Sequence, residues 1–166
     1  MIRSGRSAIS CSVRDVYKRQ ILNPAPAAAL DDAMLDLCDF ITPNETEAET
    51  LTGLPVTTLA EAEKAADALM ARGVGAVIVT LGSNGALYRD RKRSVHVPVI
   101  SVGPVVETTG AGDAFNGGLA VALSEGRDVI DAVRFGAATA GISVTRAGAA
   151  AAMPARAEID ALLARG

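Results

Sequence analysis

The sequence predicts an α/β fold with a mainly parallel sheet, and two observations support this prediction. Strand-like apolar segments alternate along the chain with segments whose apolar residues recur at helical spacing. One strand-like segment, residues 74–81, is continuously apolar and rich in β-branched side chains. Such a segment is typical of a central strand that helices cover on both faces.

The first predicted elements are short. Residues 21–22 predict the end of a strand that runs into a proline-containing turn at residues 23–26. Residues 30–37 predict a short helix, because their leucines and methionine lie at helical spacing. Residues 40–41 predict a short buried strand, which Pro43 ends because proline cannot donate to a sheet.

Two capped helices are expected before the central strand. Asn44 predicts the N-cap of an acidic helix that ends near Gly53. Thr58 begins an amphipathic helix that ends at Gly73, and residues 74–81 follow directly.

Glycine-rich turns separate the remaining elements. The sequence GSNG at residues 82–85 predicts a turn, and strands are expected at residues 86–89 and 95–99 around a basic turn at residues 91–93. A second glycine turn lies at residues 110–112. The helices expected after it are residues 113–123, 128–145 and 158–164.

Composition excludes several classes of protein. The chain has 166 residues, a net charge of −3 and 49% hydrophobic residues, which argues against intrinsic disorder and against a general nucleic-acid binder. No apolar run approaches the roughly 20 residues that cross a bilayer. Cys11 and Cys38 cannot form a disulfide scaffold or a zinc site by themselves, and they suit a reducing cytoplasm. Length alone suggests one domain.

The charge is unevenly distributed. Residues 1–20 contain five basic residues and one acidic residue, so they carry +5 − 1 = +4 and the remainder carries −3 − 4 = −7. This segment fits a mitochondrial-type presequence, a basic arm that contacts an anionic partner, or a stretch foreign to the domain. It lacks the apolar core of a secretory signal. We therefore leave residues 1–20 outside the predicted fold.

The strongest chemical feature is the sequence TTGAGDAFNGG at residues 108–118. Small residues let a ligand approach the backbone closely, and the loop opens onto a helix whose free N–H groups attract anions. Asp113 lies at the expected helix start, where a carboxylate next to a bound phosphate could take the proton of an attacking hydroxyl. The alternative is that Asp113 only caps the helix. The loop is neither a Walker A loop nor a dinucleotide fingerprint.

Several motifs together resemble the ribokinase/PfkB family of carbohydrate kinases. The residues that carry the resemblance are ETTGAGDAFNGG at 107–118, LNPAPA at 22–27, TPNETEAE at 42–49, VTLGSNGA at 79–86 and AVRFGAATAGISVTRAGA at 132–149. They follow one another with family-like spacing, and the resemblance covers residues 21–166. It implies a ribokinase-like three-layer α/β/α fold, and an ATP-dependent kinase that converts ribose and ATP to ribose 5-phosphate and ADP.

The resemblance also implies roles for single residues. Asp113 matches the base that deprotonates the sugar hydroxyl, while Gly110, Ala111 and Gly112 match the anion hole for the γ-phosphate. Asn44 and Glu47 match an Asn-x-x-Glu motif that organises the phosphates and Mg²⁺, although both residues alone fit a helix start. The positions that match nucleotide contacts are Thr80, Gly82, Ser83, Gly85 and, near the adenine, Ala137.

A potassium site beside the anion hole is implied as well. The matching positions are Glu107, Thr109, Ser143, Arg146, Gly148 and Ala152. Two of them depart from the family, because Glu107 replaces the usual aspartate and Ala152 has no side-chain oxygen. Potassium activation is therefore less firmly implied than nucleotide binding. His96 and the basic turn at residues 91–93 are expected to be structural or exposed.

The resemblance covers only the C-terminal half of a family member. The N-terminal strands, the glycine-rich sugar motif and the small β lid are absent, so we expect weak or no ribokinase activity from these residues alone and an open sheet edge. The complete enzyme would act on a small sugar and ATP as a cytoplasmic homodimer, without nucleic acid or membrane. Alternatives are fructokinase, another PfkB sugar kinase, or a non-catalytic nucleotide-binding remnant.

Overall fold

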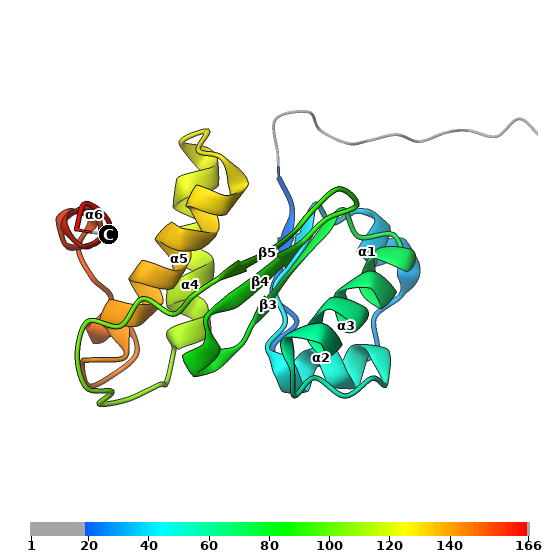
Figure 1. Ribbon diagram of the computed structural model, residues 1–166, viewed down its shortest axis with the longest axis horizontal. Helices are drawn as coiled ribbons and strands as arrows, with labels where there is room; N and C mark the ends of the chain where they lie inside the picture. Colours follow the sequence, from blue (N-terminus) through cyan, green and yellow to red (C-terminus); the bar gives the residue numbers. More distant parts are fainter. Residues whose placement is uncertain (1–18, 166) are drawn as a thin grey trace, which may run out of the picture.

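The computed structural model describes residues 19–165, so the predictions for residues 1–18 of the basic leader lie outside the described residues. A five-stranded sheet separates two helical layers (Figure 1). The strands are β1 (Ile21–Leu22), β2 (Phe40–Ile41), β3 (Ala76–Thr80), β4 (Ala86–Arg89) and β5 (Ser94–Val97), and they pair in that order.

The sheet is mixed. β1, β2 and β3 pair in parallel, whereas β3–β4 and β4–β5 pair antiparallel. Four strands therefore still run in one direction, and only β4 runs against them. The α/β prediction is confirmed, but half of the pairings are antiparallel because short turns connect the last three strands, and such turns can join only antiparallel neighbours.

Helices cover both faces of the sheet (Figure 1). On one face lie α1 (Asp32–Asp36), α2 (Glu45–Thr52) and α3 (Leu59–Ala71), and on the other lie α4 (Ala111–Ser124) and α5 (Val129–Ser143), with α6 (Arg156–Leu163) packed beyond α5. Two short 3₁₀ turns, η1 (Gly82–Asn84) and η2 (Ala150–Ala152), complete the described elements.

The central strand separates two hydrophobic cores. Ala76 and Ile78 pack in the core that contains Phe115 and Phe135, while Val77 and Val79 pack in the core on the opposite face. This alternation confirms the prediction that residues 74–81 form a strand buried on both faces, and it is the three-layer arrangement implied by the resemblance.

Several boundaries differ from the predicted ones. The helix expected at residues 30–37 spans only Asp32–Asp36 and begins at the side-chain cap of Asp31. β5 ends at Val97 rather than Val99, because Pro98 has no N–H for the sheet. The last helix begins at Arg156 rather than Glu158, since the Glu158 carboxylate accepts from the N–H of Ala155 and so caps an earlier start.

β1 begins at Ile21 as expected, and Gln20 just before it is also hydrogen-bonded to the chain at β2. The carbonyl of Gln20 accepts from the N–H groups of Asp39 and Phe40, and the Gln20 N–H donates to the Asp39 carboxylate. These bonds hold Gln20 beside the start of β2. No helix in the described residues is long and apolar enough to cross a membrane.

Candidate functional site

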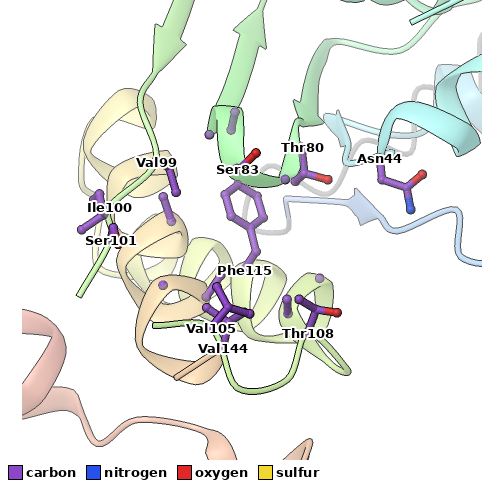
Figure 2. A pocket seen from close by; sticks show the side chains of 18 of the residues that line it. Asn44, Thr80, Ser83, Val99, Ile100, Ser101, Val105, Thr108, Phe115 and Val144 are labelled. Atoms are coloured by element: carbon purple, nitrogen blue, oxygen red, sulfur yellow. The ribbon is translucent and has the colours of Figure 1, made fainter. Parts of the chain in front are cut away.

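A cavity of about 470 Å³ opens where α2, the β3–β4 turn, α4 and α5 meet (Figure 2). Most of its lining is apolar, and the side chains of Asn44, Thr80 and Thr108 lie on one side of it (Figure 2). Residues of the predicted site that line it are Asn44, Thr80, Gly82, Ser83, Gly85, Ala111, Gly112 and Ala137. The other lining residues are Glu45, Ala86, Val99, Ile100, Ser101, Val102, Gly103, Val105, Thr108, Phe115, Ala140, Gly141 and Val144.

The turn between β3 and β4 forms one wall. Its residues 82–84 make a 3₁₀ turn, and the Leu81 N–H donates to the Gly85 carbonyl at 2.8 Å. His96, which was expected to be structural or exposed, lies exposed on β5, and its Nε2 is 2.6 Å from the Asn84 carbonyl oxygen in this turn. The wall presents Thr80 and Ser83 to the cavity (Figure 2).

An irregular segment, residues 98–109, forms the apolar wall together with α5. The N–H groups of Val106 and Glu107 both donate to the Val144 carbonyl, which anchors one end. At the other end the Ile100 carbonyl oxygen lies only 2.1 Å from where a Cβ on Gly141 would be. The absence of a side chain at Gly141 therefore lets this segment lie directly on α5.

Gly141→Ala is expected to destabilise the chain by about 1–3 kcal/mol, because the new methyl group would overlap the Ile100 carbonyl. In an open helix position the same substitution stabilises by up to about 1 kcal/mol. Gly117→Ala on α4 is the matched control, since nothing lies within 4 Å of its added Cβ. Urea unfolding of both variants measures the difference, and equal midpoints would contradict the close packing of residues 98–109 on α5.

The first turn of α4 lines one end of the cavity with Ala111 and Gly112. Gly110 is the N-cap in the left-handed region, with φ of 79°, and an added Cβ there would lie 3.1 Å from Ala149. The Ala111 N–H donates to the Thr108 carbonyl. Within the described part of the chain the N–H groups of Gly112 and Asp113 have no hydrogen-bond partner, so they remain available to an anion.

Asp113 is the third residue of α4, because the helix begins at Ala111 and not at Asp113 as predicted. The alternative that Asp113 caps the helix is therefore wrong. Its exposed carboxylate makes no hydrogen bond or ion pair among the described residues, and it lies beside the cavity rather than in its lining. Gly110 also lies outside the lining.

Asn44 and Glu47 form a capping box at the start of α2. The Asn44 Oδ1 accepts from the Glu47 N–H and Glu47 Oε2 accepts from the Asn44 N–H, each at 2.9 Å. Asn44 lines the cavity, whereas Glu47 does not. Both residues therefore hold the helix start, and the Asn44 Nδ2 group is left without a partner among the described residues.

None of the six predicted cation residues lines the cavity, and two of them, Glu107 and Gly148, are in direct contact. The Glu107 carboxylate accepts from the Gly148 N–H at 2.7 Å, and this bond, together with one from Thr109, holds the pKa of Glu107 below its usual value. The Ser143 hydroxyl donates to the Ala140 carbonyl, and the Arg146 guanidinium pairs with Glu158. Ala152 is buried in η2. No group of three or more His, Cys, Asp or Glu side chains in the described residues could hold a metal ion.

The model of the pfkB family carbohydrate kinases matches residues 6–156 of this sequence. The chain belongs to the pfkB family of carbohydrate kinases. The matched range includes residues 6–20, which the sequence analysis left outside the fold.

Three similar proteins are each matched by this chain over only part of their own length. The ribokinase of Haemophilus influenzae is 46% identical over 138 residues, which are 83% of this chain and 45% of that protein. The deoxyribokinase of Salmonella typhi is 44% identical over 81% of this chain and 44% of that protein. The solved structure of Arabidopsis thaliana ribokinase complexed with ribose and ATP matches with a TM-score of 0.80 and 35% identity, over 87% of this chain and 47% of that one. The chain thus spans a little under half the length of these relatives.

The pfkB likeness confirms the predicted ribokinase-like α/β fold. The structure also adds a set of cavity residues that the motifs did not indicate, namely Val99, Val102 and Val105 of the irregular segment. Val99 was expected at the end of a strand, whereas Val102 and Val105 lie in a stretch with no helical or strand periodicity. All three valines remain exposed in the folded chain, which is the signal that could have indicated them.

Proposed function

We propose that this chain is the nucleotide-binding and catalytic-base part of an ATP-dependent sugar kinase that transfers the γ-phosphoryl group of ATP to a hydroxyl of ribose. The observation that carries the proposal is the junction between an apolar cavity and the free N–H groups of Gly112 and Asp113. A flat aromatic base suits the apolar cavity, and a phosphate suits the free N–H groups at a helix start.

The chemistry then follows from the first turn of α4. The Gly112 and Asp113 N–H groups would stabilise the charge on the transferring phosphoryl group. The exposed Asp113 carboxylate, which has no partner among the described residues, would take the proton of the sugar hydroxyl as its oxygen attacks the γ-phosphorus. ADP would leave toward the cavity.

The relatives support ribose as the acceptor and leave a second candidate. The Arabidopsis ribokinase structure contains ribose and ATP, and the Haemophilus relative is a ribokinase. The deoxyribokinase of Salmonella typhi is 44% identical, so deoxyribose is the second candidate. The sugar contacts would come from the part of these relatives that this chain does not match, which is why we expect these residues alone to turn over sugar weakly or not at all.

Two metal ions are part of the proposal. Mg²⁺ would arrive with ATP, and the Asn44 amide and the Glu47 carboxylate at the start of α2 are oxygen donors of the kind Mg²⁺ prefers. Potassium would bind between residues 107–109 and 143–152, where Glu107 supplies a carboxylate. The other positions, Thr109, Ser143, Arg146, Gly148 and Ala152, would contribute mainly backbone carbonyls, because the Arg146 and Ser143 side chains already have partners. Potassium would hold the two segments together beside the anion hole.

Gly112→Ala is expected to weaken ATP binding by about tenfold or more without destabilising the fold. Nothing lies within 4 Å of an added Cβ at Gly112, so the methyl group would occupy only the space assigned to the phosphate. Gly117→Ala is the matched control on the same helix, with equally open surroundings outside the cavity. Calorimetric titration with MgATP and urea unfolding separate the two effects.

If the unmodified chain binds no ATP, or if Gly112→Ala binds it as tightly as Gly117→Ala, the proposed phosphate position is wrong. A coupled ADP-release assay on a polypeptide that also carries the sugar-binding half tests the acceptor, with ribose, deoxyribose and fructose as substrates. We expect sugar turnover to depend on the sugar-binding half. This expectation is wrong if these 166 residues alone phosphorylate ribose at the rate of a complete kinase.

A further inference from the structure

A chain of side-chain hydrogen bonds joins the sheet to the first turn of α4. The Thr42 hydroxyl donates to Asn116 Oδ1 at 2.8 Å, and the Asn116 Nδ2 group donates to the Gly112 carbonyl at 2.9 Å. Thr42 directly follows β2 and is only 3% exposed, while Asn116 is half-buried on α4. The two residues are 74 positions apart in the sequence, so the link is purely tertiary.

The amide of Asn116 has a defined orientation in this link. Its nitrogen end must face the Gly112 carbonyl, which can only accept, and its oxygen end must then face the Thr42 hydroxyl, which can donate. The Thr42 hydroxyl lies farther, at 3.3 Å, from the Leu22 carbonyl, which already accepts from the Thr42 N–H at 2.9 Å. An asparagine at this position therefore satisfies both ends, and neither Asp nor Leu would.

We propose that Thr42 and Asn116 are positioning residues for the phosphate-binding turn of α4. Gly110 and Gly112 have no side chains that could hold this turn in place, and no N-cap side chain forms a hydrogen bond with its backbone. The Gly112 carbonyl and the free Asp113 N–H belong to one peptide unit, and the free Gly112 N–H belongs to the preceding one. The bond to the Gly112 carbonyl therefore ties this part of the turn to the end of β2. Since Asn116 follows Asp113 by three residues, the same link also holds the face of α4 that carries the Asp113 carboxylate.

This inference rests on the proposed function, and its consequence is specific to the γ-phosphate. ADP has no γ-phosphate, so loosening the turn should weaken ATP binding and leave ADP binding nearly unchanged. Loss of one such hydrogen bond corresponds to about a three- to tenfold change in affinity. A residue that only stabilises the fold would not change the ratio of the two dissociation constants.

The test measures calorimetric dissociation constants of MgATP and MgADP for the complete 166-residue chain. Thr42→Val removes the donor to Asn116, and Thr42→Ser restores it. Thr139→Val is the matched control, because Thr139 is also buried and its hydroxyl donates to the Phe135 carbonyl within α5 at 2.8 Å. We expect the preference for ATP over ADP to fall about three- to tenfold in Thr42→Val and to stay unchanged in Thr42→Ser and Thr139→Val.

Asn116→Leu provides a second variant at a half-exposed position, for the case in which Thr42→Val does not fold. We expect it to lose the same preference for ATP. If the unmodified chain binds ATP and ADP equally, the proposed γ-phosphate site itself is wrong. If the unmodified chain prefers ATP and both Asn116→Leu and Thr42→Val keep that preference, the positioning role is wrong while the proposed function stands.

Discussion

Asp113→Asn is expected to lower sugar phosphorylation by about 10²–10⁴-fold while leaving ATP binding intact. The amide keeps the size of the carboxylate and cannot accept the proton of the attacking hydroxyl. The Asp113 carboxylate has no partner among the described residues, so its loss should not disturb the fold. The rate is measured by coupled ADP release, in a polypeptide that joins these residues to the sugar-binding half of the family.

Asp131→Asn is the control that the chain itself offers. Asp131 is the third residue of α5, just as Asp113 is the third residue of α4, and both are exposed. Each substitution removes the same favourable interaction of a negative charge with a helix N-terminus, about 0.3–1 kcal/mol. Only Asp113→Asn should change the rate. Turnover by Asp113→Asn at the rate of Asp131→Asn would refute the role of Asp113 as the base.

Gly85→Ala is expected to destabilise the chain by about 3 kcal/mol or more. Gly85 has φ of 89°, a conformation that side chains disfavour, and an added Cβ would lie 2.1 Å from the Val97 carbonyl oxygen and 2.7 Å from the backbone of Pro98 and Val99. The β3–β4 turn could accept a methyl group only by moving away from the end of β5. Since this turn lines the cavity, ATP binding should weaken as well.

Gly126→Ala separates the two contributions to that effect. Gly126 has φ of 77°, but nothing lies within 4 Å of its added Cβ. Its substitution therefore introduces the backbone strain alone, about 1–2 kcal/mol. Urea unfolding gives both free energies. Equal losses in the two variants would mean that the close approach of Gly85 to β5 has no energetic weight.

The helix caps show how much local sequence could predict. Asn44, Thr58 and Asp128 each accept from an N–H two or three residues later, as expected for N-caps, and Gly53 ends α2 with a left-handed backbone. These interactions lie within one helical turn, so neighbouring residues are sufficient to identify them. The start of α4 was predicted two residues too late, at Asp113 instead of Ala111. Its N-cap, Gly110, has no side chain that could form a recognisable capping bond.

The candidate site also contains residues that the local sequence indicated and residues that it did not. Motif positions such as Thr80, Gly82 and Gly112, which the sequence singled out, line the cavity. The cavity wall formed by residues 100–105 was not predicted, because this stretch has no secondary structure of its own. Its place depends on a close approach to Gly141, which is 41 residues beyond Ile100 in the sequence.

The sequence by itself determined the alternation of strands and helices, the side-chain caps of α2, α3 and α5, the buried central strand and membership of the pfkB family, because periodicity, capping and ordered motifs are properties of the linear chain. Only the tertiary structure decided which N–H groups of α4 stay free, which valines complete the cavity, and that Thr42 reaches Gly112 through Asn116. These features depend on distances of a few ångströms between segments far apart in sequence, and such distances are set by how the two cores pack against the sheet.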